Sequence, residues 1–302
     1  MPNLHDIQRR INSVNSTKQI TRTMEMVSAA KIRRATERVT EATPYAESMI
    51  EMLGNVTARA GKQSNPLLDT HEDLKSVLFI AVVSDRGLAG GFNTNVLRPV
   101  EKRIRVLEAE GVKCHVIACG KKALSFFNFR GIDMEMTFTD LSADPTFDEA
   151  STIASRAIEG YIDQTYDKVV ILYNHAKNAA EQTLEIETVL PVDEMAVAAA
   201  EFLEQAEEEA KTGVPSGDVD FEPEPEDVLD NLLPAFVRTV IYHALIDSAA
   251  GEQGARRNAM KNATDNANEM VETLERYYNR VRQGAITTEL NEIVGGAAAL
   301  EE

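Results

Sequence analysis

Apolar residues repeat at alternating steps of three and four near both ends of the chain. Toward the start they are Ile32, Ala35, Val39, Ala42, Ala46, Met49 and Leu53, and toward the end Met260, Ala263, Ala267, Met270, Leu274, Tyr277 and Val281. This spacing keeps one narrow apolar seam of a helix facing a partner helix, as in a coiled coil. It predicts a first helix over residues 3–59 and a last helix over about 227–294. Pro44 predicts a kink or local break in the first helix near Thr43.

The middle of the chain alternates between short apolar runs and helical segments. The first run, residues 76–85, is almost continuously apolar, as expected for a parallel strand that is buried on both faces. Further strands are expected within residues 112–120, 134–140, 167–176 and 182–192, and helices over 94–110, 121–129 and 147–164. This βαβαβαββ order predicts a mainly parallel sheet with helices on its faces and the last, alternating strand at an edge.

The predicted fold class is therefore α/β, with a long antiparallel coiled coil of the terminal helices and a Rossmann-like, mainly parallel α/β domain. Residues 1–60 and 227–302 are expected to form the coiled-coil shaft, and residues 74–192 the α/β domain. Residues 193–226 are rich in acid, Pro and Gly, which favours a connector between the two.

If the two helices pair from the α/β domain outward with equal rise, the numbers of facing residues sum to about 280. The first helix then turns polar at Lys18, Thr21, Glu25 and Ser28, opposite polar residues 252–256. The last helix outruns its partner by about twenty residues beyond Tyr277. That overhang carries Ile286, Leu290, Ile293 and Val294, which predicts that another protein forms a sleeve around it.

Charge and composition narrow the possible partners. The net charge of −18 argues against nucleic acid as the main partner. Residues 1–40 hold eight Lys or Arg against three Asp or Glu, whereas residues 201–230 hold twelve acidic residues against Lys211 alone. The basic start is either a solvated helix face or a surface for an acidic partner. No apolar run reaches membrane-spanning length, and the start has no apolar signal segment, so no direct membrane insertion is expected.

The sequence contains only weak signals for a catalytic or ligand-binding site. The glycine cluster GLAGGFN, residues 87–93, follows a strand and precedes a helix, where phosphate-binding loops lie, but it matches neither GxGxxG nor a P-loop. A tight turn is the favoured interpretation. The histidines are scattered without metal-ligand spacing, so no catalytic residue, cofactor or metal is expected. Cys114 and Cys119 are five residues apart in one predicted strand, on opposite faces, which argues against a disulfide between them.

Several longer motifs carry a resemblance to a known family. They are INSVNSTKQITRTMEMVSAAK (11–31), SDRGLAGGFN (84–93), DFEPEPEDVLDNLLP (220–234), ARRNAMKNATDNA (255–267) and ITTELNEIVGGAAA (286–299). Together they resemble the gamma-subunit family of F-type ATP synthases over nearly the whole chain. The terminal motif has that family's signature positions Ile286, Thr287, Glu289, Glu292, Gly296 and Ala297. The acidic stretch at residues 201–218 departs from the family by its length.

The resemblance implies a non-catalytic rotor shaft of the F1 sector. Such a shaft couples rotation of a proton-driven c-ring to ATP synthesis or hydrolysis at the β subunits. Its partners are the α and β subunits of the α3β3 hexamer, the epsilon subunit and the c-ring, on the cytoplasmic face of the cell membrane as a peripheral protein. By motif match, Met24 and Arg256 face the moving loops of β.

The same resemblance implies two further contact sites. Gln283, Thr287 and Glu289 would meet a β subunit, and Phe221 and Glu222 the c-ring. Two alternatives remain from the residues themselves: a nucleotide-binding α/β domain with helical arms, and a static coiled-coil scaffold.

Overall fold

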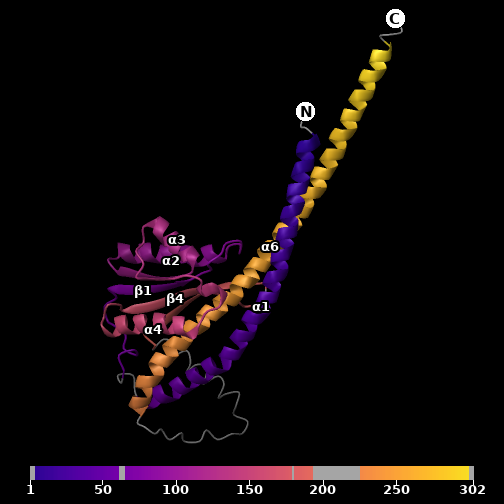
Figure 1. Cartoon of the computed structure of the whole chain (residues 1–302). Helices are drawn as coiled ribbons and strands as arrows, with labels where there is room; N and C mark the ends of the chain where they lie inside the picture. The colour runs from indigo at the N-terminus through magenta and orange to yellow at the C-terminus, as the bar shows by residue number, and fades with distance from the viewer. Residues whose placement is uncertain (1–3, 61–64, 179, 193–224, 299–302) are drawn as a thin grey trace. The chain divides into compact units, whose positions relative to one another are not determined.

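The computed structural model describes residues 4–60, 65–178, 180–192 and 225–298 (Figure 1). It forms two compact units: residues 1–28 with 256–302, called the helix-pair unit below, and residues 29–255, called the α/β unit. The connector predicted at 193–226 lies almost wholly outside the described residues, so the predicted domain boundaries remain a prediction.

Two long helices contribute to both units. Helix α1 spans Leu4–Ala60 and helix α6 spans Pro225–Ala298. Of the kink or local break predicted near Thr43, the break is wrong, because α1 continues through Pro44. A proline inside a helix removes one backbone hydrogen bond, and the apolar seam on either side of Pro44 offsets that loss by packing. The seam itself is confirmed, with Met49 and Leu53 buried and the positions from Ile32 to Ala46 half-buried.

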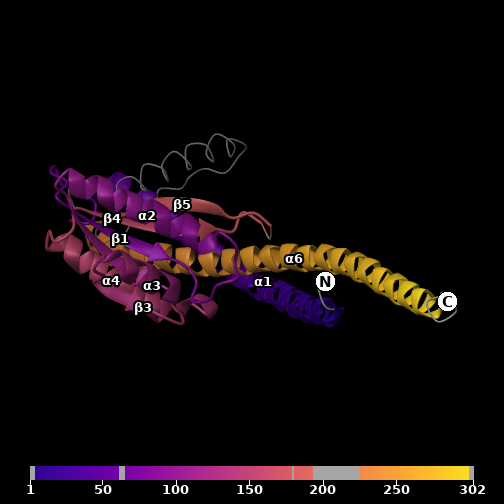
Figure 2. The same ribbon diagram turned by 90° about the horizontal axis from the view of Figure 1, so that it is seen from above.

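The α/β unit is built on one five-stranded sheet in the order β3-β2-β1-β4-β5 (Figure 2). The strands are β1 (Ser76–Val82), β2 (Lys113–Cys119), β3 (Met136–Phe138), β4 (Lys168–His175) and β5 (Thr183–Leu190). All neighbours pair in parallel except β4 and β5, which are antiparallel. Every residue of β1 is buried, as its continuous apolar run predicts, and β5 lies at an edge. The predicted mainly parallel sheet is confirmed.

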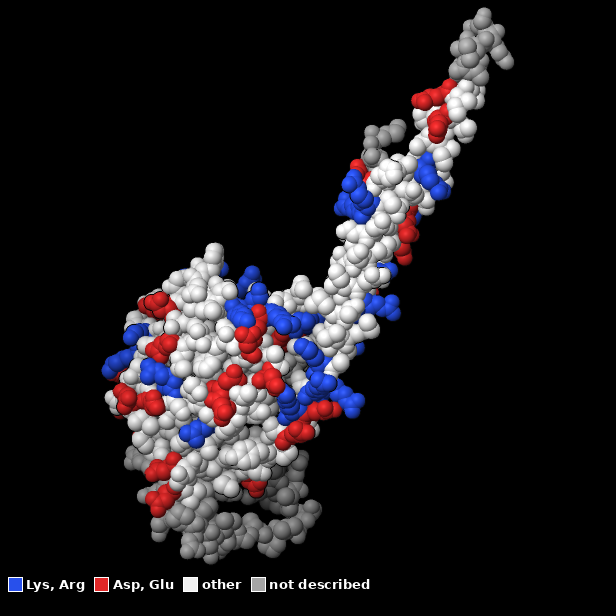
Figure 3. Space-filling model, in the orientation of Figure 1, with Lys and Arg blue, Asp and Glu red and all other residues white. Residues whose placement is uncertain are grey.

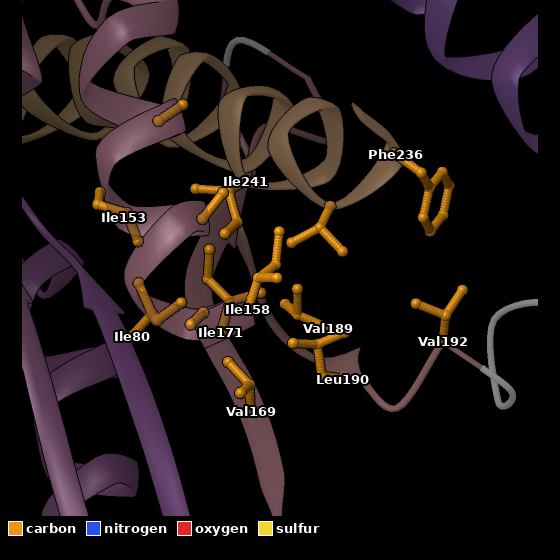
Figure 4. Packing of buried hydrophobic residues seen from close by; sticks show 14 of the residues in the cluster. Ile80, Ile153, Ile158, Val169, Ile171, Val189, Leu190, Val192, Phe236 and Ile241 are labelled. Atoms are coloured by element: carbon orange, nitrogen blue, oxygen red, sulfur yellow. The ribbon is translucent and has the colours of Figure 1, made fainter. Parts of the chain in front are cut away.

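Helices cover both faces of this sheet. Helices α2 (Phe92–Ala109) and α3 (Lys121–Arg130) lie on one face, and α4 (Phe147–Ile162) lies on the other (Figure 1). A short 3-10 helix, Leu141–Ala143, precedes α4. The face with α4 also receives the end of α1 and the first part of α6, so that side chains from Leu229 to Leu245 pack among those of α4, β1 and β4. Figure 4 shows Ile241 of α6 near Ile158 of α4 and Ile171 of β4, and Phe236 on the side of Val192, which follows β5.

The link between β2 and α3 is a single glycine in a crowded place. Gly120 has φ +104°, and its N–H donates to the Phe138 carbonyl oxygen at 2.8 Å. A Cβ at this position would lie 2.9 Å from the Val83 carbonyl carbon and 3.0 Å from the Ser84 carbonyl oxygen. Only glycine fits here, for both conformational and steric reasons.

The two cysteines are free thiols on opposite faces of β2, as predicted. Cys119 packs in the core with α4 and α6, and Cys114 packs against the core with α2. Burial raises the pKa of Cys114 to about 11 and that of Cys119 to about 12. Both thiols are therefore protonated and poorly reactive at neutral pH.

Edge strand β5 contains a carboxyl group with an unusual titration. Burial, and secondarily the charge of Glu185, raises the pKa of Glu187 from 4.5 to about 7. The folded state therefore retains a proton that the unfolded chain loses between these two pH values. The free energy of unfolding should fall as pH rises through this window and level off above it.

We expect Glu187→Gln to flatten that pH dependence and to stabilise the chain above about pH 7, because the amide carries no charge to desolvate. Urea unfolding midpoints measured across the window test this. Glu185→Gln, which removes only the second cause, should retain most of the dependence. Parallel profiles for Glu187→Gln and the unmodified chain would contradict the assignment.

Among the described residues, none of the helices has a stretch long and apolar enough to cross a membrane.

Candidate partner-binding site

The helix-pair unit is held together by one seam. Its buried or half-buried positions on α1 are Leu4, Ile7, Ile11, Val14, Asn15, Lys18, Thr21, Met24, Glu25 and Ser28. Those on α6 include Arg256, Met260, Ala263, Thr264, Ala267, Val271, Leu274, Tyr277, Tyr278 and Val281. The steps of three and four continue the heptad pattern, and the helices run antiparallel (Figure 1).

The register of this pair differs from the prediction. The hydroxyl oxygens of Thr21 and Thr264 are 2.7 Å apart, so the facing residue numbers sum to 285 rather than 280. The shift of five residues is about 1.4 helical turns. It arises because side-chain fit, rather than equal rise from a common base, sets the register. The seam also passes through Val271, which is 8 % exposed, and not through Met270, which is 47 % exposed.

The α1 side of the seam is polar in the middle, as predicted, but the residues opposite are not 252–256. With this register they are about 257–267, which include Met260, Ala263 and Ala267. Thr21 and Thr264 share a buried hydroxyl contact, and Thr264 also donates to the Met260 carbonyl oxygen at 2.9 Å. Buried polar groups of this kind cost little stability when they are hydrogen-bonded, and they fix register more than apolar side chains do.

Beyond Val281 the last helix has no cover from the described part of α1. Every residue from 282 to 294 is exposed, including Ile286, Leu290, Ile293 and Val294 at 50–66 %. Their spacing of three and four places them on one stripe, and Figure 3 shows few charged side chains along this part of α6. A stripe of exposed large apolar side chains is typical of a surface that a partner covers.

The predicted contact residues fall into two separate places. Met24 is half-buried and Arg256 is buried, both in the seam. Gln283, Thr287 and Glu289 are exposed, and the Thr287 hydroxyl donates to the Gln283 carbonyl oxygen at 2.9 Å. Arg256 and Gln283 are about 40 Å apart along the helix, so the structure does not bring the two sets together. Phe221 and Glu222 lie outside the described residues.

Two exposed apolar residues of α1, Ile20 and Val27, were missed by the sequence argument. They are 61 % and 51 % exposed on the outside of the helix pair, as is Met26 at 59 %, which the sequence indicated as a core or interface residue. The seven-residue spacing of Ile20 and Val27, off the seam phase, was the signal available in the sequence.

A basic cavity lies in the α/β unit, where α1 passes the 3-10 helix. Lys31, Arg34 and Arg38 line a hollow of about 180 Å³ together with Ser142 and Gln253. Arg38 also forms an ion pair with Asp144. The hollow concentrates positive charge within a chain that is acidic overall, which suits an acidic partner. Figure 3 shows Lys and Arg interspersed with Asp and Glu over the visible face of the α/β unit.

The glycine cluster after β1 forms a tight turn that leads into α2. Leu88 and Gly90 have φ of 64° and 58°. Asp85 accepts hydrogen bonds from the backbone N–H groups of Lys121, at the start of α3, and Asp140, both at 2.9 Å. Burial opposes ionisation of Asp85, but these hydrogen bonds outweigh it and lower its pKa. The Asp85 carboxylate therefore occupies the start of α3, whereas the start of α2, into which the glycine cluster leads, has no side-chain cap.

Within the described ranges, no three His, Cys, Asp or Glu side chains are grouped so that they could hold a metal ion.

Known proteins match this chain over almost its full length. The family model described as ATP synthase matches residues 3–300. The ATP synthase gamma chain of Leptospira biflexa is 41 % identical over 295 residues, covering 98 % of each chain. That of Heliobacterium modesticaldum is 41 % identical over 300 residues, covering 99 % of this chain and all of the relative.

Solved structures show the same architecture. A chain of the central stalk and c-ring structure of the Tetrahymena thermophila mitochondrial ATP synthase superposes with a TM-score of 0.59 at 27 % identity, covering 81 % of this chain and 99 % of that one. A chain of the Euglena gracilis mitochondrial enzyme gives 0.65 at 22 % identity, covering 98 % and 94 %, which supports the fold. The chain described here belongs to the ATP synthase gamma chain family.

Proposed function

We propose that the chain is the central rotor shaft of an ATP synthase. It turns with the proton-driven c-ring and passes that rotation to the catalytic β subunits, without carrying out chemistry itself. The observation that carries this proposal is the exposed apolar stripe of residues 286–294 on α6, beyond the part of this helix that pairs with α1. A stripe of this kind needs a surrounding sleeve, and an α3β3 hexamer would supply one.

The partners follow from the same role. The helix pair enters the α3β3 hexamer, and the α/β unit meets the epsilon subunit and the c-ring. The neighbouring structures of Tetrahymena and Euglena come from stalk, F1 and c-ring assemblies, which supports this set. The chain would then be a peripheral protein at the cytoplasmic face of the cell membrane.

We assign to the contact residues the roles that the family resemblance implies. Gln283, Thr287 and Glu289 form the upper contact with a β subunit, since all three are exposed on the uncovered end of α6. Met24 and Arg256 lie near the moving loops of β, and Phe221 and Glu222 meet the c-ring. The basic cavity lined by Lys31, Arg34 and Arg38 offers a further surface to acidic loops.

The decisive experiment separates turnover from folding. Gln283→Ala in the assembled enzyme should lower coupled ATP synthesis by about two- to tenfold, the equivalent of one lost intersubunit hydrogen bond. The free energy of unfolding of the chain should change by less than about 0.5 kcal/mol, because the side chain is exposed. Arg256→Ala should also lower turnover more than stability.

Asn268→Ala is the matched control, since it removes another exposed amide from α6. Its turnover should stay near that of the unmodified enzyme. Equal losses of turnover and stability in Gln283→Ala would refute the proposal.

A further inference from the structure

The carboxyl ends of β1 and β4 meet where the sheet changes direction. These strands are parallel neighbours, but β1 leads through α2 to β2 on one side, whereas β4 leads to β5 on the other. In doubly wound sheets a crevice opens at this point and usually holds a ligand. In this chain, residues of α2 and α6 occupy it instead.

The first turn of α2 binds both strands. The Asn174 side-chain Nδ2, at the end of β4, donates to the Phe92 carbonyl oxygen at 2.8 Å. Asn93 Oδ1 accepts from the backbone N–H of Ser84, just after β1, at 2.9 Å. Asn174 and Ser84 are fully buried. The start of α2 therefore joins the two strand ends into one rigid block.

His175 and Ala176, which follow Asn174 in the chain, bind Asp247 of α6. Asp247 Oδ2 accepts from His175 Nδ1 at 2.6 Å, and Asp247 Oδ1 accepts from the Ala176 backbone N–H at 3.1 Å. The Asp247 side chain is 2 % exposed. A buried carboxylate whose two oxygens both accept hydrogen bonds from one strand end has little freedom to move.

One turn further along α6, the helix backbone itself touches the block. A Cβ at Gly251 would lie 3.1 Å from the Asn174 carbonyl oxygen and 3.4 Å from both Gln182 Cγ and Phe92 Cε2. The absence of a side chain lets α6 approach β4 and α2 this closely.

From this geometry we propose that His175, Ala176, Asp247 and Gly251 form a strand–helix clamp that transmits twist between the sheet of the α/β unit and helix α6. The proposal rests on the proposed rotor function. His175 and Asp247 act in it as positioning residues, because they touch no nucleotide and no reacting group.

The physical reason for a clamp is the nature of the other contacts of α6. From Leu229 to Leu245 this helix is held to the sheet by apolar packing. Apolar contacts are non-directional, so they resist separation more than they resist rotation of a helix about its own axis. Hydrogen bonds to a buried carboxylate depend on distance and angle, and twisting α6 against β4 would break them.

The test measures torsional stiffness in an assembled α3β3–gamma complex. A bead attached through Phe129→Cys reports rotation of the α/β unit, since Phe129 is 84 % exposed and the native thiols are poorly reactive. At a nucleotide-locked pause, the angular variance gives the stiffness. We expect His175→Ala to raise this variance by about twofold, because one of the two hydrogen bonds to Asp247 is lost.

Two variants distinguish loss of the clamp hydrogen bond from a nonspecific loss of structure. His175→Asn, whose amide can donate from nearly the position of Nδ1, should restore the variance of the parent. Lys177→Ala, which removes an exposed ion pair with Glu181 nearby, should leave it unchanged. ATP hydrolysis without load should be the same in all variants. A purely structural role would lower the thermal midpoint of His175→Ala and leave the variance at that of the parent, which would overturn the clamp.

The same experiment distinguishes failure of the clamp from failure of the proposed rotor function. If the parent complex shows no ATP-driven rotation of the bead, the rotor function fails. If the parent rotates and folded His175→Ala keeps the stiffness of the parent, only the clamp fails.

Discussion

Gly120→Ala is expected to destabilise the α/β unit by about 3 kcal/mol or more, from strain and overpacking together. The φ of +104° is unfavourable for alanine, and its Cβ would press against the backbone of Val83 and Ser84, which follow the neighbouring strand β1. Val83 cannot move aside without losing the hydrogen bond that its N–H donates to the Cys119 carbonyl oxygen at 3.0 Å. Urea unfolding followed by circular dichroism would measure the loss.

Gly131→Ala is the matched control for this prediction. Gly131 also has a positive φ, +68°, at the end of α3, but a Cβ there would meet nothing within 4 Å. It should cost only about 1 kcal/mol, the conformational term alone. Similar losses in both variants would show that the close approach of Gly120 to β1 contributes nothing.

The second large effect is expected from a disulfide crosslink between the helix pair and a surrounding β subunit. A cysteine placed at Val27, which is 51 % exposed on the helix pair, can be joined by oxidation to a cysteine engineered in a facing β subunit. If the chain rotates, the crosslink should lower ATP hydrolysis by more than about tenfold, because turnover requires the motion that the crosslink blocks. Adding a reductant should restore the activity.

The chain without the engineered cysteine serves as the control for the oxidant. Its two thiols are protonated at neutral pH, because burial raises the pKa of Cys114 to about 11 and that of Cys119 to about 12. Full activity in a completely crosslinked complex would favour the static scaffold over the rotor.

The sequence predicted the elements well because each had a strong local signal. The continuous apolar run of β1 and the alternation in β5 indicated a central and an edge strand, and the sheet has both. The uncovered stripe at Ile286 and Leu290 followed from helix lengths alone and is confirmed. These features depend on residues near one another in sequence.

What the sequence could not give depends on fit between distant residues. The seam at Val271 rather than Met270 reflects the drift of a 3.6-residue helix against a heptad, which a pattern of apolar letters cannot resolve to one position. The contact of Asp247 with His175 joins residues 72 apart, and neither has a motif that marks it. The roles of the contact residues, Gln283 among them, remain predictions that only an assembled complex can test.

The position of α6 in the chain has a consequence for biosynthesis. Residues 229–245 complete the core on one face of the sheet, yet the ribosome makes them after every strand has emerged. Until then Ile80, Ile153 and Ile171 have no cover from the last helix. About three quarters of the chain must therefore be synthesised before α6 can begin to complete this core. Nascent chains that stall earlier would expose apolar surface and bind chaperones.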